Sequence, residues 1–387
     1  MENKDQSQEV ALETKPRKLS YFNRFALLLN YGVILLLLIS YLSAHVSPGN
    51  FWMIAFFGLC FPIFFVLNLF FVVYWLIQWK MKFLFSFLAL LIGFNYASKY
   101  FQINLREAPA ETGSAIEKLK LMSFNVRLFD LYNWSHNKET RSKIFDFIKD
   151  ESPNIICLQE FFNSDKGDFQ NFDTLCKFQK AKYGHREYTV TLHNDNDHWG
   201  IATFSSYPIV NRGKISFHAR NSNNMCIYTD IKINNDTIRV YNMHLQSVHF
   251  RNRDYKFISD LVNNKDSLDL EYSKNILRRL KTAFIKRSSQ VDLVAEHIKS
   301  SPYPVIVCGD FNDTPCSYAY NVLSQGLTDA FVESGNGFGR TYIGIFPSFR
   351  IDYLLHSPSI HSYDFQTIPE ELSDHYPISC YLSLKKQ

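Results

Sequence analysis

The sequence lacks closely spaced cysteine pairs. Its seven cysteines form no CxxC motif and show no Cys/His spacing of the kind that binds zinc. This excludes a disulfide-dense miniprotein and favours buried or free thiols. Low-complexity tracts are absent, which excludes collagen-like and disordered chains. Charged residues make up 20% of the chain and the mean hydropathy is −0.16, values that are ordinary for a folded protein.

Beyond residue 100 the sequence has no excess of positive charge. Residues 1–100 contain eight of the 41 lysines and arginines and four of the 37 acidic residues, which leaves 33 of each for the remaining chain. The formal net charge of +4 therefore belongs to the N-terminal quarter. A strongly basic surface for sequence-independent binding of nucleic acid is not indicated, although nucleic acid stays among the candidate substrates.

Charge is also missing from two long stretches, residues 25–42 and 51–77. Runs of this length have no polar face to present to water, which argues against core helices of a soluble domain. A cleaved signal peptide is the alternative for the first run, but its apolar region is too long and further apolar runs follow. Since a span needs about 20 apolar residues, the sequence predicts three membrane spans, at about 25–44, 51–77 and 83–101.

Basic residues flank these spans unevenly. Four precede the first span closely, the first loop has none, and Lys80 and Lys82 lie in the second loop. Because lysine and arginine favour the cytoplasmic side, we expect a multi-pass membrane protein whose C-terminal part is extracytoplasmic. The chain then divides into a cytoplasmic basic tail (1–24), a membrane anchor (25–101), a polar linker (102–117) and a candidate catalytic domain (118–387).

Short apolar runs alternate with helical patterns in the last of these parts. The two runs at 225–233 and 237–245 flank Asn234-Asn235 and predict a hairpin. Helical spacing occurs at 139–150 and over much of 254–300. Strands that follow one another in groups, with helices between, predict two stacked mixed β-sheets flanked by helices. The other predicted strands are 118–126, 154–160, 199–206, 304–312, 350–356 and 376–384.

Acidic, amide and imidazole side chains recur where these strands end. A strand end presents side chains to a cleft, and carboxylates from separate strands can converge on a divalent cation. Asp310 and Asn312 face the same side of one strand, where they can hold and deprotonate one water. Such an inventory suits attack of an activated water on a phosphate ester. Its members are Asn125, Glu160, Asn242, His244, Asp310, Asn312, Asp352, Asp374 and His375.

In their order along the chain, seven stretches resemble the motifs of the exonuclease–endonuclease–phosphatase superfamily. This superfamily includes pancreatic-type deoxyribonucleases, abasic-site endonucleases, bacterial sphingomyelinases and inositol-polyphosphate 5-phosphatases. The resemblance implies a four-layer α/β sandwich and a Mg²⁺-dependent phosphoric ester hydrolase, with Mn²⁺ or Ca²⁺ as alternative ions. The stretches are SFNVRLFD, CLQEF, GIATFSSYPI, YNMHL, VIVCGDFNDTP, FRIDYLL and SDHYPI, within residues 119–384.

The resemblance also implies which residues bind metal and phosphate. Glu160 would be the main metal ligand, with Asn125 beside it and in contact with the phosphate. Asp374 would lie near the ion or bind a second one. Arg127 departs from the pattern, because several nucleases carry an acidic residue there. Arg127 is therefore a candidate phosphate contact or a partner of a neighbouring acid.

Five residues carry the catalytic roles that the resemblance implies. Asp310 would take a proton from the attacking water, which Asn312 would orient. His375 would donate to a non-bridging phosphate oxygen, and Asp352 would hold that imidazole in its charged form. His244 is the candidate general acid for the leaving group.

These patterns bear on three candidate functions. The favoured one is a membrane-anchored phosphoesterase that acts on a phosphodiester or phosphomonoester, such as a lipid phosphodiester or nucleic acid. The alternative is a non-catalytic, membrane-tethered binding or scaffold protein with the same fold, which the loss of a motif residue would indicate, and no motif residue is missing. A transporter is disfavoured because the spans carry no charge to line a substrate path.

A basic cluster lies in the predicted helical region between His244 and Asp310. One interpretation is that it binds phosphates or lipid headgroups, and the other is that it forms an ordinary solvated helix face. The cluster consists of Arg278, Arg279, Lys281, Lys286 and Arg287.

Overall fold

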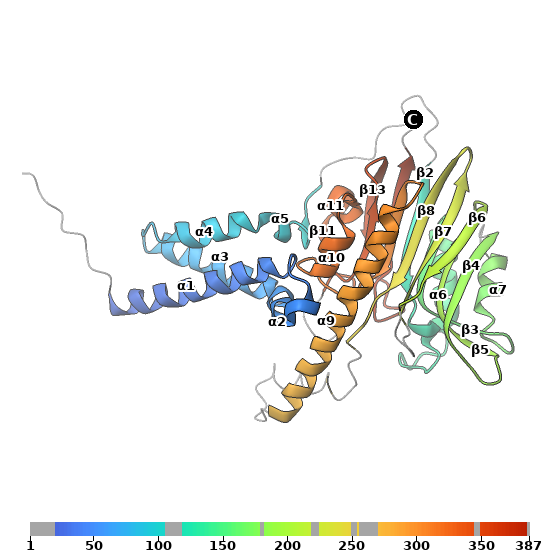
Figure 1. The fold of residues 1–387 in the computed structure, drawn as a ribbon, viewed down its shortest axis with the longest axis horizontal. Coiled ribbons are helices and arrows are strands. Elements are labelled where there is room, and N and C mark those ends of the chain that lie inside the picture. Colours follow the sequence, from blue (N-terminus) through green and yellow to red (C-terminus); the bar gives the residue numbers. More distant parts are fainter. Residues whose placement is uncertain are drawn as a thin grey trace, which may run out of the picture.

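The computed structural model describes residues 20–104, 118–178, 182–217, 224–248, 254, 270–343 and 349–384. The predicted basic tail lies almost wholly outside the described residues, as does most of the predicted linker. The described C-terminal part contains two six-stranded mixed sheets, and apolar helices extend from one side of them (Figure 1). The two stacked mixed sheets that the sequence predicts are therefore confirmed.

Both sheets combine parallel and antiparallel neighbours. The first has the spatial order β10 (Thr328–Asp329), β12 (Asp352–His356), β9 (Val305–Asp310), β8 (Asp236–His244), β7 (Met225–Ile233) and β6 (Ile209–Ile215). The second has the order β13 (Ile360–Thr367), β14 (Ile378–Leu384), β2 (Lys118–Asn125), β3 (Ile155–Ser164), β5 (Asp197–Ser205) and β4 (Tyr183–Leu192). A separate pair joins β1 (Phe101–Gln102) to β11 (Gly337–Phe338).

Two parallel pairs, β2 with β3 and β8 with β9, lie inside these sheets. Parallel neighbours need a crossover connection; α6 (Thr140–Glu151) lies in the first and α9 (Leu270–Lys299) in the second. The predicted hairpin is present as β7 and β8, and Asn234 in its turn has a φ of +54°, as a tight hairpin turn requires. The carboxyl ends of the parallel strands supply the edge at which the candidate site forms.

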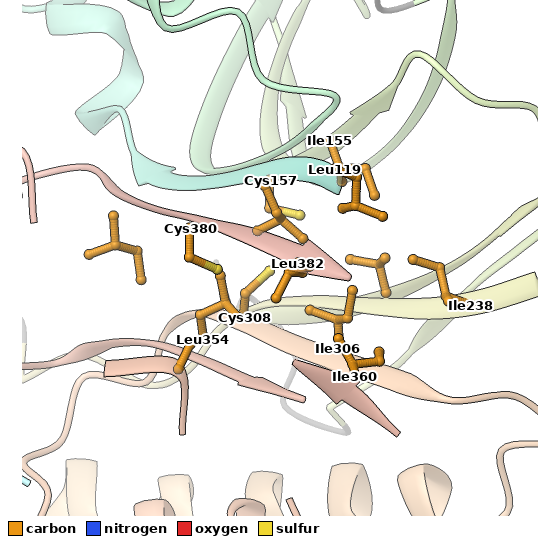
Figure 2. Packing of buried hydrophobic residues seen from close by; sticks show 14 of the residues in the cluster. Leu119, Ile155, Cys157, Ile238, Ile306, Cys308, Leu354, Ile360, Cys380 and Leu382 are labelled. Atoms are coloured by element: carbon orange, nitrogen blue, oxygen red, sulfur yellow. The ribbon is translucent and has the colours of Figure 1, made fainter. Parts of the chain in front are cut away.

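Helices cover the outer faces of the sheets, which completes four layers. Apolar residues of α9 and α10 (Tyr318–Leu323) pack on the first sheet, and those of α6 and α7 (Asn171–Phe178) pack on the second. Between the sheets, Cys157 of β3 packs with Cys308 of β9 in one continuous apolar core (Figure 2). All seven cysteines are free and five of them are buried, as the sequence predicts.

The N-terminal helices differ from the three predicted spans. Helix α1 (Tyr21–Leu42) is long and apolar enough to cross a membrane, at about 33 Å. The second run breaks into α2 (Pro48–Leu59) and α3 (Phe61–Ile77), which bend by 49° and count as a span only if taken together. The third run gives the short helices α4 (Phe83–Ile92) and α5 (Phe94–Ala97). Three spans are therefore not found: one helix qualifies, or two with the bent pair.

Physical reasons for these breaks lie in the sequence. Pro62 lies in the first turn of α3, where it lacks the N–H that a continuous helix would use. Gly93 follows the last residue of α4 and approaches Tyr41 so closely that a Cβ atom there would lie 2.0 Å from the Tyr41 hydroxyl oxygen. Hydropathy along the chain measures apolar composition and does not register either break.

Packing among α1, α3 and α4 combines buried apolar side chains with a buried polar network. The side chain of Asn30 is fully buried, accepts a hydrogen bond from Trp75 Nε1 at 2.9 Å and donates to Ser86 Oγ at 2.5 Å. Large apolar side chains point outward, such as Leu28 at 68% exposure and Phe70 at 60%. The bundle therefore exposes large apolar side chains around a core that also contains hydrogen-bonded polar groups.

The N-terminal helices dock near the loop that follows β9. Ser43 Oγ donates to the carbonyl of Cys316 at 2.7 Å, and Arg350 Nη1 donates to the carbonyl of Lys99 at 3.1 Å. A Cβ atom on Gly58 would lie 2.4 Å from the Cys316 carbonyl oxygen, so the close approach of α2 requires glycine. The helices are thereby fixed to the part of the sheet domain that follows Asp310.

An ion-pair cluster at the far end of β12 yields a prediction about stability. Glu333 in α11 (Ala330–Ser334) lies 3.0 Å from His356 Nε2 and 3.3 Å from His361 Nδ1. Desolvation raises the pKa of Glu333, but hydrogen bonds from His356 and Ser362 outweigh it and lower the pKa to about 2. This depressed pKa stabilises the fold above the ordinary glutamate pKa of about 4.3, and the gain is lost as the pH falls toward about 2.

We therefore expect Glu333→Gln to reduce the free energy of unfolding by about 1–3 kcal/mol near pH 6. Urea unfolding of both proteins between pH 6 and pH 3 measures the difference, which should shrink below about pH 4.3. Glu370→Gln, at an exposed residue of the same chain, is the matched control and should have little effect. A difference that stays constant over this pH range would contradict the assignment.

Candidate active site

The predicted site residues meet at one end of the two sheets. Asn125 ends β2, His244 ends β8 and Asp310 ends β9. Asp310 is the register partner of both His244 and Asp352, the first residue of β12. Asn125 Nδ2 donates to Asp310 Oδ2 at 3.1 Å although 185 positions separate them, so the site is shared between the sheets.

A buried histidine lies between two aspartates. His375 Nδ1 is 2.9 Å from Asp352 Oδ2, and its Nε2 is 3.7 Å from Asp310 Oδ2. Burial alone would lower the pKa of His375, but the carboxylates of Asp352 and Asp310 raise it well above its ordinary value. Burial also raises the pKa of Asp310, to about 6, against the opposing effect of His375. The structure thus holds an imidazolium beside a carboxyl group that can exchange a proton near neutral pH.

Glu160 lies across the site from this pair, at a β-bulge. The register of β3 against β5 shifts around this residue, which has a φ of +47°. A bulge changes the direction of a side chain, and here it places Glu160 Oε1 3.5 Å from Asn125 Nδ2 and 3.7 Å from His244 Nε2. Desolvation and the nearby carboxylate of Asp374 raise the pKa of Glu160.

Arg127 and Asp374 form an ion pair at the rim. Arg127 Nε is 3.4 Å from Asp374 Oδ2, and about a third of each side chain is exposed. The guanidinium also lies 4.7 Å from the ring centre of Trp134. Residues Arg127–Asp130 (η1) all have positive φ, and this left-handed segment turns the chain away after β2. Of the two roles considered for Arg127, the structure shows the pairing with an acid.

Asn312 follows β9 in a left-handed conformation with a φ of +54°. Its backbone N–H donates to Asp310 Oδ1 at 2.8 Å, and its side-chain amide donates to the carbonyl of Leu245 at 3.0 Å. These bonds hold the Asp310 carboxylate and tie the loop to the end of β8. The role of Asn312 in orienting water stays a prediction.

One group of side chains has the donor chemistry of a divalent-cation site. Asn125, Glu160 and Asp374 offer an amide and two carboxylates, the ligands that hard cations prefer. Burial, and after it the carboxylate of Asp374, raises the pKa of Glu160, and a cation beside Glu160 would favour its charged form. These are the residues that the sequence predicts as metal ligands, and the chemistry of the donor set suits that role.

A second group in the described residues also has the spacing of a metal site. Ligand atoms of Asp310, Asp352 and His375 all lie within 4.8 Å of one another. Within this group His375 Nδ1 is already engaged with Asp352 Oδ2 at 2.9 Å, and its Nε2 faces Asp310 Oδ2 at 3.7 Å. This arrangement also suits proton transfer between the imidazole and the Asp310 carboxyl group.

Two residues that support the site were not predicted from the sequence. Gln159 Nε2 donates to Asn242 Oδ1 at 2.7 Å, and Asn242 Nδ2 donates to the carbonyl of Ala202 at 2.9 Å, which ties the sheets together beneath the site. Ser373 Oγ donates to the carbonyl of Asn125 at 2.7 Å. Gln159 and Ser373 directly precede the predicted site residues Glu160 and Asp374 in the sequence. This adjacency was the sequence signal that could have identified them.

Two family models match the chain. One, described as the Endonuclease/Exonuclease/phosphatase family, matches residues 122–375. The other, described as a domain of unknown function, matches residues 23–100. The two matches divide the chain near the boundary between the N-terminal helices and the sheets. No curated protein matches the sequence.

Solved structures share the fold at low sequence identity. An endonuclease/exonuclease/phosphatase from Beutenbergia cavernae has 16% identity and a TM-score of 0.50, with 69% of this chain and 72% of that chain covered. A family protein from Bacteroides thetaiotaomicron has 16% identity and a TM-score of 0.51, covering 70% and 96%. A functionally unknown protein from Enterococcus faecalis has 14% identity and a TM-score of 0.51, covering 69% and 100%.

Proposed function

Because the family model covers residues 122–375, the chain belongs to the endonuclease/exonuclease/phosphatase family, and we propose that it is a metal-dependent hydrolase of a phosphate ester. Members of this family are typically hydrolases that act on phosphate esters. One observation carries the proposal for this chain: the Asp352–His375 pair, at 2.9 Å, faces the buried carboxyl group of Asp310. This combination brings a proton acceptor and a cationic donor together at one site.

In the proposed mechanism, Asp310 accepts the proton of the attacking water. Its raised pKa of about 6 makes it a stronger base than an exposed aspartate. Asn312 holds the Asp310 carboxylate through its backbone N–H and is proposed to orient the water. His375, kept charged by Asp352, donates to a non-bridging oxygen and stabilises the charge that develops there.

His244 is proposed to protonate the leaving group. Its Nε2 lies 3.7 Å from both Glu160 Oε1 and Asp310 Oδ2, so it faces the same cleft as the proposed base. A divalent cation held by Asn125, Glu160 and Asp374 would polarise the phosphate and neutralise its charge. Mg²⁺ is the proposed ion, with Mn²⁺ or Ca²⁺ as alternatives. The binding or scaffold alternative is disfavoured because every predicted catalytic residue is present in the sequence.

We further propose that the N-terminal helices anchor the enzyme in a lipid bilayer. Support comes from α1, which is long enough to span, and from the bundle's buried Asn30 and outward Leu28 and Phe70. The distribution of basic residues supports an extracytoplasmic catalytic domain. Protease added to intact cells should then digest the domain, and digestion only after lysis would contradict this side.

The proposed substrate is a phosphodiester or a phosphomonoester, such as a lipid phosphodiester or a nucleic acid. The tether favours a substrate at the membrane, and the balanced charge beyond residue 100 gives no general attraction for nucleic acid. Rates with a lipid phosphodiester, single-stranded DNA and an inositol phosphate, compared at matched metal and salt, would separate these candidates.

Glu160→Gln tests the proposed metal site. We expect the Mg²⁺ concentration for half-maximal hydrolysis of bis-p-nitrophenyl phosphate to rise about 10–100-fold, because the variant loses a charged ligand. Activity at saturating Mg²⁺ should recover in part. Glu187→Gln, at an acidic residue on β4 that pairs with Lys214, is the matched control. An unchanged metal requirement in the Glu160 variant would contradict its role as a ligand.

A further inference from the structure

The basic cluster on α9 contains two arginines with acidic partners inside the fold. Arg287 is buried, and its Nη1 lies 2.6 Å from Asp313 Oδ2. Arg279 Nη1 lies 2.8 Å from Asp254 Oδ2. These two arginines stabilise the packing of α9, so neither is available to bind an external anion.

Three exposed cations share one face of the N-terminal half of α9. Lys274, Arg278 and Lys281 are spaced i, i+4 and i+7, which places them on the same side of the helix. The ion pairs given above for α9 involve its other two arginines, and Glu271 is an exposed acid one turn before Lys274. Leu277, 39% exposed, lies between the three cations. We call the three cations and Leu277 the basic face.

The basic face lies beside the proposed anchor. Lys281 Nζ is 5.5 Å from the ring centre of Trp52 in α2, and α2 packs against α9. Helix α2 lies between α1 and α3 in the chain and contacts both α9 and the loop that follows β9, so it is at the end of the bundle that meets the sheet domain. In Figure 1 the N-terminal half of α9 projects past α2 at this end of the bundle. Tryptophan and lysine are the residues that favour the boundary between lipid and water.

We propose that the basic face of α9 binds the headgroups of anionic lipids at the surface of the bilayer in which the N-terminal helices sit. The inference rests on the proposed anchor and adds a second, peripheral contact with the membrane. Its cations supply charge complementarity to anionic headgroups, and Leu277 supplies a small apolar contact between them.

Lipid binding at the basic face would affect the active site, because α9 also contacts the loop that follows β9. The same helix carries Arg287, whose partner Asp313 lies one residue after Asn312 in the loop that follows β9. Lipid binding at the basic face would therefore fix the orientation of the catalytic cleft relative to the bilayer surface.

The test uses the full-length protein in nanodiscs of phosphatidylcholine, with and without phosphatidylglycerol. Hydrogen exchange of residues 270–282 should slow about tenfold when phosphatidylglycerol is present, and the effect should fade at high ionic strength. The variant K274Q/R278Q/K281Q should lose this dependence on lipid. K286Q is the matched control, because Lys286 is exposed on another side of α9, and it should retain the dependence.

Equal exchange in the two lipid compositions would overturn the inference, as would the same slowing in the triple variant. Equal slowing by inorganic phosphate in phosphatidylcholine nanodiscs would assign the face to free phosphate and would also overturn it. Incorporation into nanodiscs and hydrolysis of a soluble ester are measured on the same samples. Failure of the protein to enter nanodiscs would contradict the proposed membrane anchor, and absence of hydrolysis would contradict the proposed enzymatic activity. Both outcomes are therefore distinguishable from a basic face that does not bind lipid.

Discussion

Asp310→Asn is expected to reduce kcat/KM about 10²–10⁴-fold while the fold stays intact. The carboxyl group is buried at the end of β9 and lies 3.7 Å from both His244 and His375. Asparagine has nearly the same shape, and its side-chain oxygen can still accept the hydrogen bond from the Asn312 N–H. What the variant loses is the oxygen that takes up the proton of the water, which is also the oxygen that accepts a hydrogen bond from Asn125 Nδ2.

The thermal midpoint of the metal-free variant separates this effect from damage to the fold. Burial raises the pKa of Asp310 to about 6, which means that the charged form is disfavoured in the folded protein. At neutral pH the neutral asparagine should therefore leave the midpoint unchanged or raise it. Hydrolysis of bis-p-nitrophenyl phosphate at saturating Mg²⁺ gives kcat/KM, and the midpoint is recorded on the same preparation.

Asp230→Asn is the matched control for loss of a buried aspartate. Asp230 in β7 lies 2.6 Å from the guanidinium of Arg239, on a strand that carries none of the proposed catalytic residues. This variant should lower the thermal midpoint and leave kcat/KM within about threefold of the parent. If Asp310→Asn kept that level of activity, Asp310 could not be the base.

The sequence predicted buried strands better than edge strands. Strands β2 and β9 lie within the predicted ranges 118–126 and 304–312, because continuous apolar runs are typical of buried central strands. The edge strands β4 and β6 were not predicted. Their residues are mostly half-buried or exposed, so no regular alternation marks them in the sequence.

The N-terminal region shows a different limit of sequence analysis. Hydropathy identified the apolar segments correctly, since α1, α3 and α4 are all apolar helices. Whether two helices join into one span depends on backbone geometry at Cys60 and Gly93, where the helices are interrupted. A hydropathy value averaged over a window of residues does not report the backbone geometry at a single position.

The candidate site was predicted as a set of residues, and the contacts of its members needed the structure. Strand ends and residue chemistry identified Asp310 and Glu160, because a strand end is a property of the local sequence. The ion pair of Arg127 with Asp374 depends on a left-handed segment after β2, and a run of non-glycine residues with positive φ has no sequence signal. The buried Arg287 likewise looks like any other cation of a charged helix until its partner Asp313 is seen.

A double-mutant cycle at His375 and Asp352 should show that the two side chains act as one unit. We expect His375→Gln to reduce kcat about 10²–10³-fold, because it removes the donor to the developing charge. Asp352→Asn should reduce kcat by a smaller factor with little change in KM, since Asp352 acts by holding the imidazole at 2.9 Å. The double variant should be only as slow as His375→Gln, because without the imidazole the carboxylate has nothing to position.

Glu333→Gln and His361→Gln are the matched controls for this cycle. They break another carboxylate–histidine contact, in which Glu333 lies 3.3 Å from His361. Glu333 also contacts His356, which ends β12 at the opposite end from Asp352. Neither should change kcat, although the first lowers stability. Multiplicative losses in the double variant would mean that Asp352 contributes independently of His375. The expected result is a loss in kcat that is no larger in the double variant than in His375→Gln. It would support a direct role for the imidazolium at the reacting phosphate, with the aspartate holding the imidazole in place.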